Sequence, residues 1–522
     1  MQLHPKGVDS TPCGADAGPR FVRHNPSLRR PHQSVGPATR PGTWRSACPP
    51  ADRTPVPRRS RMGDAHPLLA ALSSARHGAL HRRVLLTVSA MFFFDLADLN
   101  TFAFAAPAIR RAHLFTVDDI AFVTALAFAG MAVGAILGGR FADQVGRRRV
   151  MTGSVVLFSA ASVVNALVTA VGAMAAARFA TGFGLGAMTS VAITYLSEVT
   201  PAARRGRVQA TALGTGLVGI PVVAFTARGL TADDPGGWRA LFVIGALGVL
   251  LVPFLMRLPE SPRWLLARGR SAEAVRVTRA FVPDWEPSAD ALAAPPAPAG
   301  RPRFSELFAV GQRRNTVALM VLWLFGLVGF YGFQSWVPTL LADHGQDFAK
   351  SMTMSAVTTI GAVPGAFLAW PFIDRYPRKH LAVVLGLVVA ALGIGYGLSS
   401  SVVAVVVFGT LVAALSQTFI AVLYSYTPEV FPTRLRTAGA GLGNGVGRIG
   451  NVIAPLVVAA IYTTPGLGYI AVFVFIAGCW LVATATVFFF GVDTRGRSLE
   501  TLHDAAAAPV ASAAPVSQRI GE

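Results

Sequence analysis

The stretch that decides the fold is Val84–Ile109, VLLTVSAMFFFDLADLNTFAFAAPAI, an apolar run of membrane-spanning length that contains two acids, Asp95 and Asp98. The acids are one helical turn apart, so a helix places both on one face. A charged side chain at a bilayer centre costs about 2.5–3.5 kcal/mol, and acids at that depth mark proton handling, ion coupling or substrate contact. This stretch therefore predicts a membrane helix that carries a functional site.

Composition supports the same class. The 522 residues are 53% hydrophobic and 14% charged, with a mean hydropathy of +0.52, which is typical of a polytopic membrane protein. The net charge of +20 lies in a tail and in loops between apolar spans, so we expect contact with lipid and none with nucleic acid. The sequence has no metal-ligand spacing and no phosphate-binding glycine loop. We therefore expect no metal site, no cofactor and no enzymatic activity.

The chain divides by composition. Residues 1–83 are rich in Pro, Arg and Ser and are predicted to form a disordered basic tail, with a tail that touches anionic lipid as the alternative. Twelve apolar runs of about 20 residues follow, the length that a ~30 Å hydrocarbon core requires. We predict an all-α membrane protein with two six-helix halves, 84–257 and 315–491, a cytoplasmic linker, 258–314, and a cytoplasmic C-terminal tail, 492–522. The predicted spans are 84–109, 119–141, 150–171, 173–197, 208–228, 238–257, 315–342, 352–373, 380–399, 402–427, 437–462 and 467–491.

Charge in the loops predicts the orientation. With a cytoplasmic N-terminus, the inner loops hold 22 Lys and Arg residues and the outer loops hold five. Positive residues favour the cytoplasmic side. Both termini are therefore expected in the cytoplasm, and the protein in the inner membrane of a bacterial cell.

Two charged motifs recur at one interval. The residues Asp143, Arg147 and Arg148 are matched in the second half by Asp374, Arg378 and Lys379. The motif Glu198-Val-Thr-Pro-x-x-x-Arg205 is matched by Glu429-Val-Phe-Pro-x-x-x-Arg436. The spacing from Asp143 to Asp374 equals the spacing from Glu198 to Glu429, and we call it the repeat interval. A repeat of this kind predicts duplicated halves related by parallel pseudo-symmetry.

At these motifs the chain resembles the major facilitator superfamily, over residues 84–502. The loop Gly139–Arg149 is similar to the loop between the second and third helices of that superfamily, with Gln144 where a basic residue is usual. The motif Pro259–Trp264, PESPRW, and the late stretch 493–500 resemble the branch that contains sugar porters and organic-acid:proton symporters. The resemblance implies a twelve-helix monomer that transports a small molecule by alternating access, with a central site between two rocking halves.

Within that branch, the pattern Asp95-x-x-Asp98, residues 330–341 and Gly447-Arg448-Ile449-Gly450 look most like aromatic-acid:proton symporters, with Leu96 in place of the usual glycine. The stretch Gly216–Pro221 has no Gly-Pro pair, whereas the drug exporters of the superfamily carry one in helix five. Proton-coupled uptake of an organic acid is therefore favoured over export.

Depth links three ionisable residues. At 1.5 Å per residue, Asp98 and Arg178 each lie about 21 Å from the cytoplasmic face, and Asp95 about 16 Å. We assign Asp95, Asp98 and Arg178 to proton coupling, because a buried Arg needs an anionic partner that a proton can replace. The resemblance implies the same pairing in sugar:proton relatives. A static salt bridge, or an Arg178 side chain that extends toward the headgroups, is the alternative.

Arg448 falls near the midplane, about 16 Å deep, where a guanidinium suits bidentate capture of a carboxylate. The alternative is a structural pair with Asp95, and the two readings are compatible if a substrate carboxylate displaces Asp95. Polar groups within apolar spans complete the predicted binding site, with aromatic-belt or interhelical hydrogen-bonding roles as alternatives. They are Tyr331, Gln334, Gln417 and Asn100.

The charged motifs are predicted to hold the cytoplasmic side closed through ion pairs, since each basic cluster contains an acid; the alternative is a topology signal alone. This predicted gate comprises Asp143, Arg147, Arg148, Glu198, Arg205, Asp374, Arg378, Glu429 and Arg436. For the whole protein we predict proton-coupled uptake of a small organic acid, such as an aromatic acid. The alternatives are a sugar or polyol:proton symporter, a drug or metabolite exporter, and a membrane sensor that does not transport.

Overall fold

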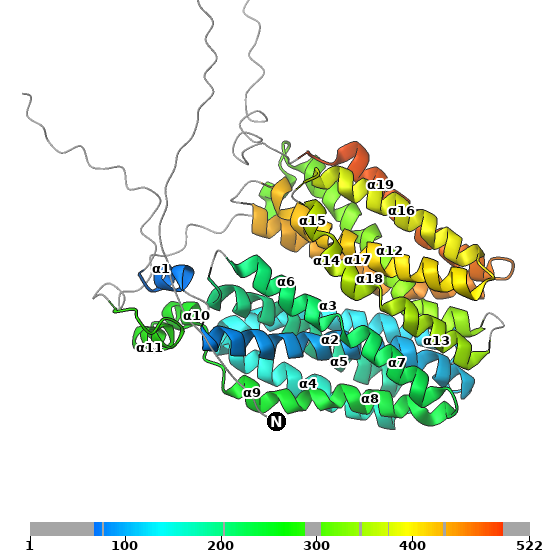
Figure 1. The fold of residues 1–522 in the computed structure, drawn as a ribbon, viewed down its shortest axis with the longest axis horizontal. Coiled ribbons are helices and arrows are strands. Elements are labelled where there is room, and N and C mark those ends of the chain that lie inside the picture. Colours follow the sequence, from blue (N-terminus) through cyan, green and yellow to red (C-terminus); the bar gives the residue numbers. More distant parts are fainter. Residues whose placement is uncertain are drawn as a thin grey trace, which may run out of the picture. The chain divides into compact units, whose positions relative to one another are not determined.

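The computed structural model describes residues 67–75, 78–201, 204–287, 304–343, 347–373, 375–431 and 435–493. Within these ranges, twelve helical spans are long and apolar enough to cross a bilayer, as the sequence predicts (Figure 1). The first six are α2 (Ala79–Arg111), α3 (Val117–Val145), α4 (Arg147–Leu167), α5 (Val171–Val199), α6 (Arg205–Gly216) with α7 (Gly219–Thr231), and η2 (Pro235–Gly237) with α8 (Trp238–Ala246), η3 (Leu247–Leu251) and α9 (Val252–Met256). The second six are α12 (Arg313–Asp343), α13 (Phe348–Thr359) with α14 (Ala362–Leu368) and α15 (Trp370–Ile373), α16 (Arg378–Leu398), α17 (Val402–Val430), α18 (Arg436–Thr463) and α19 (Gly468–Phe490).

Helical residues lie within the segment that is predicted to form the basic tail. Helix α2 begins at Ala79, and α1 (Pro67–Ser74) lies inside the predicted tail, 1–83. Leu68 and Leu72 of α1 are buried in one apolar cluster with Trp264, because α1 packs against the linker helix α11 (Ser271–Phe281), next to α10 (Pro262–Ala267). A short turn, η5 (Phe304–Phe308), precedes α12. The rest of the predicted tail, 1–66, residues 288–303 of the linker and residues 494–522 lie outside the described residues.

Several helix boundaries of the two halves are separated by the repeat interval. Thr116 begins α3 by accepting a hydrogen bond from the backbone of Asp119, and Asp347, one repeat interval later, begins α13 in the same way with Lys350. Both ends of α4 and α16, and both ends of α5 and α17, are also separated by the repeat interval. The interval seen in two sequence motifs therefore extends to the helix boundaries.

Glycines let one helix pair in each half approach closely. A Cβ on Gly134 of α3 would overlap the backbone carbonyl of Phe183 on α5. A Cβ on Gly365 of α14 would overlap the carbonyl of Ala414 on α17, at the equivalent place in the second half. Small residues at such contacts allow tight packing of membrane helices. Each half is thus built on a closely packed pair of helices.

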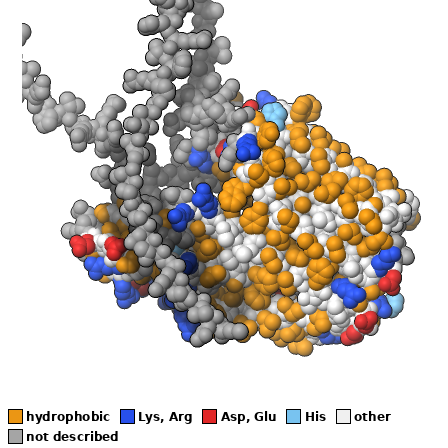
Figure 2. Space-filling view, viewed as in Figure 1, with side chains coloured by type: hydrophobic (Ala, Val, Ile, Leu, Met, Phe, Trp, Pro, Cys, Tyr) orange, Lys and Arg blue, Asp and Glu red, His pale blue; other side chains and the backbone are white. Residues whose placement is uncertain are grey.

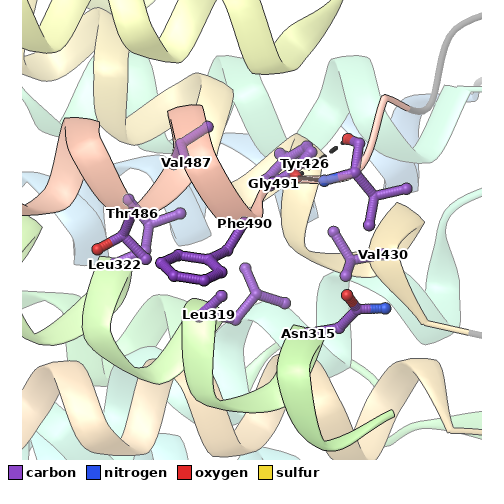
Figure 3. A pocket seen from close by; sticks show the side chains of 11 residues that line it. Asn315, Leu319, Leu322, Tyr426, Val430, Thr486, Val487, Phe490 and Gly491 are labelled. Atoms are coloured by element: carbon purple, nitrogen blue, oxygen red, sulfur yellow. Dashed lines mark hydrogen bonds between the residues drawn. The ribbon is translucent and has the colours of Figure 1, made fainter. Parts of the chain in front are cut away.

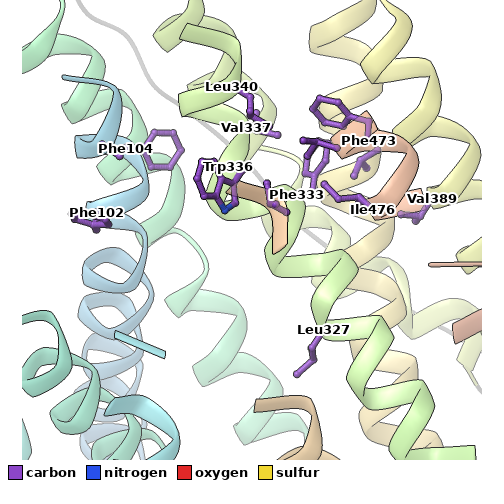
Figure 4. Packing of buried hydrophobic residues seen from close by; sticks show 14 of the residues in the cluster. Phe102, Phe104, Leu327, Phe333, Trp336, Val337, Leu340, Val389, Phe473 and Ile476 are labelled. Carbon is purple, nitrogen blue, oxygen red and sulfur yellow. The ribbon is translucent and has the colours of Figure 1, made fainter. Parts of the chain in front are cut away.

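The halves meet along a seam where α2 contacts α12, α3 contacts α18 and α7 contacts α13. Figure 4 shows Phe104 of α2 and Trp336 of α12 turned toward one another, and Phe333 beside Phe473 of α19. Hydrophobic side chains cover much of the face in Figure 2, with charged side chains at its ends, as expected of a surface that faces lipid. We call the helix ends at Arg147 and Arg378 the basic face, and those at Arg111 and Asp343 the opposite face.

Candidate transport site

Asp98 and Arg178 form a fully buried ion pair inside the first half. Arg178 Nη1 lies 3.2 Å from Asp98 Oδ2, and the two side chains are 2% and 0% exposed. The second guanidinium nitrogen donates to the backbone carbonyl of Asp98, and the Ser162 hydroxyl donates to Asp98 Oδ1 at 2.8 Å. The rings of Phe102 and Phe242 flank the guanidinium. Both oxygens of Asp98 are thus bound, and the pair predicted from depth is present.

Asp95, one turn away on α2, is in a different state. It is 3% exposed, and its Oδ2 accepts a hydrogen bond from the Thr189 hydroxyl of α5 at 2.8 Å. None of the described residues donates to its other oxygen, Oδ1. The positive charge of Arg448, on α18 of the other half, acts on this carboxyl group. Asp95 is therefore a buried acid with one carboxylate oxygen that none of the described residues hydrogen-bonds.

Arg448 brings the two halves together near this acid. Its Nη1 lies 3.1 Å from the Met131 sulfur on α3, and its charge also acts on the Tyr331 hydroxyl of α12. The Tyr331 ring packs edge-to-face on Phe128 of α3, with the ring centres 4.9 Å apart. A cation and aromatic rings thus converge opposite Asp95, an arrangement suited to a flat ligand with a carboxylate.

Comparisons with known proteins agree with this architecture. The family model described as "Sugar (and other) transporter" matches residues 84–506. The chain is a transporter of this family, within the major facilitator superfamily. Its fold is similar to that of the xylose transporter XylE of Escherichia coli in a partially occluded inward-open conformation, with a TM-score of 0.66 and 17% identity, covering 81% of this chain and 100% of that one. The predicted superfamily fold is confirmed.

Three relatives span most of the transporter. YyaJ of Bacillus subtilis, named for metabolite transport, is 35% identical over 80% of this chain and 94% of its own length. The niacin transporter NiaP of Acinetobacter baylyi is 29% identical over 81% and 97%. The 4-hydroxybenzoate transporter PcaK of Pseudomonas putida is 30% identical over 71% and 84%.

The charged residues at the basic face of the transporter pair within each half. Arg147 contacts Glu198 at 3.2 Å and Asp143 at 3.0 Å, and Arg378 contacts Glu429 at 2.9 Å. Among the other predicted gate residues, the side chain of Arg148 donates to the carbonyls of Met256 and Leu258. Arg205 and Arg436 are the first residues of α6 and α18. Asp374 lies outside the described residues.

Glu260 of the PESPRW motif was not among the predicted site residues, yet it organises this face. One of its oxygens accepts from the backbone amide of Arg147 at 2.9 Å, and both accept from that of Arg148. These amides lie at the N-terminus of α4, where a carboxylate is stabilised by the helix dipole. The motif therefore anchors the linker to the first half.

At the opposite face, polar contacts of the transporter join the two halves. Arg110 of α2 forms an ion pair with Asp343 of α12, and the Tyr462 hydroxyl of α18 donates to the same carboxylate at 3.3 Å. The guanidinium of Arg111 lies 4.9 Å from the ring centre of Phe348 on α13. The seam is thus bridged by charge at this face.

A small pocket lies away from the acids, between α12, α17 and α19 at the basic face (Figure 3). Its wall is apolar apart from Asn315, Thr486 and Tyr426, and the Tyr426 hydroxyl is held by the backbone of Val492. No ionisable carboxylate or cation of the predicted site lines it. We therefore assign the transport site to the seam and not to this pocket.

No hydrogen bond or ion pair among the described residues joins the remaining predicted binding residues to Arg448. Asn100 donates to the carbonyl of Leu96 on its own helix at 2.7 Å, which is a structural contact. Gln334 and Gln417 are half-buried on α12 and α17. Sequence reasoning missed Thr189 and Ser162; a usable signal for Thr189 is its spacing of eleven residues, three helical turns, from Arg178 on α5.

Proposed function

We propose that this transporter takes up small aromatic monocarboxylates together with protons. The observation that carries the proposal is the placement of Arg448 across the seam from Asp95, beside the Tyr331 ring. A guanidinium binds a carboxylate in a bidentate manner, and aromatic rings favour a flat apolar body. The names of two relatives, a niacin transporter and a 4-hydroxybenzoate transporter, support this substrate class.

The coupling follows from competition for Arg448. When a substrate carboxylate binds Arg448, it neutralises the positive charge that acts on Asp95, and the Asp95 carboxylate becomes more costly to keep charged in a buried site. A proton then binds at Oδ1, the oxygen that none of the described residues bonds. The buried pair of Asp98 and Arg178 senses the same proton through its neighbour one turn away, and its rearrangement accompanies the rocking of the halves. In the alternative, this pair is a static support for the first half.

We infer that the basic face is cytoplasmic, because positive residues concentrate there, and that both termini lie on that side of a bacterial inner membrane. The cross-seam contacts at the opposite face then close the outer side in the described state. On this inference the ion pairs of Arg147 and Arg378 belong to a cytoplasmic gate, which acts in a monomer.

Proton-coupled uptake of a sugar or polyol is the second candidate, favoured by the family description and by the fold shared with a xylose transporter. Arg448 argues against it, since a neutral sugar offers no carboxylate for the guanidinium to bind. An exporter would have the same architecture with the opposite direction of net flux, and a sensor would bind the same ligand without flux.

The test is uptake by proteoliposomes of labelled benzoates, short carboxylates and sugars, with and without an inward proton gradient. Accumulation of an aromatic acid only when the gradient is present is the expected result. Accumulation of a sugar instead would support the second candidate, and outward transport would support export. Binding without flux in either direction would indicate a sensor.

A further inference from the structure

Tyr424 on α17 and Asn444 on α18 form a polar pair that has no part in proton coupling. The Asn444 amide nitrogen donates to the Tyr424 hydroxyl at 3.0 Å. The Tyr424 ring packs edge-to-face on Trp323 with centres 4.9 Å apart, and Trp323 is itself fixed by donating to the Thr427 hydroxyl at 3.0 Å. Tyr424 is nevertheless 51% exposed. The ring is held in place, while much of its surface stays open.

The pair belongs to the same wall as Arg448. Asn444 and Arg448 are four residues apart on α18, so they share a face and are separated by about 6 Å along the helix axis. The Tyr331 hydroxyl of α12 lies within electrostatic range of both Arg448 and Tyr424. The axial separation of Asn444 and Arg448 is close to the length of a benzene ring that carries substituents at both ends.

We propose that Tyr424 and Asn444 recognise a hydrogen-bonding group on the substrate, across the ring from the carboxylate that Arg448 binds. The Tyr424 oxygen already accepts from Asn444, so its own proton is free to be donated to a ring hydroxyl or a ring nitrogen. The pair then selects among aromatic acids, favouring those with such a group in the para position. This rests on the proposed function, because Arg448 is taken as the carboxylate anchor.

The test compares benzoate, 3-hydroxybenzoate and 4-hydroxybenzoate as labelled substrates of the full chain in proteoliposomes. Tyr424→Phe is expected to raise KM for 4-hydroxybenzoate by about 3- to 10-fold, the effect of one lost hydrogen bond, and to leave KM for benzoate within about twofold. Asn444→Leu should act in the same direction, since the tyrosine hydroxyl then loses its orienting donor. The effect on 3-hydroxybenzoate should be smaller than on 4-hydroxybenzoate.

Tyr396→Phe is the matched control, because none of the described residues hydrogen-bonds its buried hydroxyl and its ring packs on Phe333 away from this wall. Equal losses for benzoate and 4-hydroxybenzoate in Tyr424→Phe would overturn the proposal and leave the pair as a helix-packing contact. If the variant does not fold, greater stabilisation of the wild-type protein against heat by 4-hydroxybenzoate than by benzoate is the expected result, and equal stabilisation by both would overturn the proposal. Absence of any aromatic-acid uptake by the wild-type protein would instead defeat the proposed function.

Discussion

The two halves share a backbone plan but differ at the positions that hold buried charge. Asp95, Asp98 and Arg178 of the first half are each replaced by glycine one repeat interval later. A Cβ on the glycine equivalent to Asp98, Gly329, would approach the Trp480 indole nitrogen to 2.8 Å, so an aromatic side chain fills this volume in the second half. The equivalent residues are Gly326, Gly329 and Gly409.

At two positions of the seam, the second half carries polar or charged residues where the first half carries apolar ones. Arg448 and Tyr424 of the second half correspond to Leu217 and Ile193 of the first. The acids that we propose for proton coupling therefore lie in one half, and the proposed carboxylate anchor lies in the other. After duplication, a symmetrical scaffold can divide two tasks between its halves, because the two sets of side chains meet only at the seam.

The largest expected effect on transport comes from removing one buried acid of the first half, Asp98. Asp98→Asn should abolish gradient-driven accumulation in proteoliposomes while it preserves substrate exchange, because it breaks the pair with Arg178 that is proposed to rearrange when the proton binds. The variant also leaves Arg178 buried without its anion, and breaking such a pair costs about 3–5 kcal/mol of stability. Asp118→Asn, at an exposed acid in the first turn of α3, is the control. Normal accumulation by Asp98→Asn would remove its proton role.

In the second half, the next largest effect is expected from substitution of Arg448. Arg448→Ala should weaken uptake of an aromatic acid by about 10- to 100-fold, because a charge-assisted bidentate contact is lost, and should affect binding of a neutral analogue such as benzamide far less. Arg448→Lys should recover part of the affinity, since the charge remains but the bidentate geometry does not. Equal losses for acid and amide would make Arg448 structural.

The glycine that replaces Asp98 gives a stability test. Gly329→Ala should lower the free energy of unfolding of the purified protein by about 1–3 kcal/mol, because the added Cβ meets the Trp480 ring. Gly332→Ala, one turn further along α12, is the matched control, since its Cβ would make an ordinary contact of 3.4 Å with Ile476. Equal melting temperatures for both variants would mean that the aromatic filling of the second half is loosely packed.

The smallest effect is expected where the halves remain alike. Arg147 with Glu198 and Arg378 with Glu429 are equivalent pairs, related by the repeat interval, at partly exposed helix ends. Arg147→Ala and Arg378→Ala should each cost about 1 kcal/mol or less in thermal unfolding. A large difference between the two variants would show that the asymmetry of the interior extends to the basic face.

Hydropathy and motif spacing were sufficient to predict the twelve spans and the repeat, because both are properties of position along the chain. The pair of Asp98 and Arg178 was also predictable, since depth follows from counting residues in a straight helix. Rotation about the helix axis was not predictable. Thr189 and Tyr424 take their roles from which face packs inward, and that depends on side chains of neighbouring helices. Helix α1 was missed because its eight residues form too short an apolar pattern to stand out in a basic segment.

Among the residues that the structure describes, the seam and the interior of the first half hold two acids, Asp95 and Asp98, and two arginines, Arg178 and Arg448, whose charges cancel. If each substrate carboxylate enters together with one proton, the substrate-bound site carries the same net charge as the empty site. Work done by a membrane voltage depends on the charge that moves across the bilayer. Transport of this kind is electroneutral, so changing the voltage at constant pH difference leaves the rate unaltered, and the proton gradient contributes through its pH difference and not through the voltage.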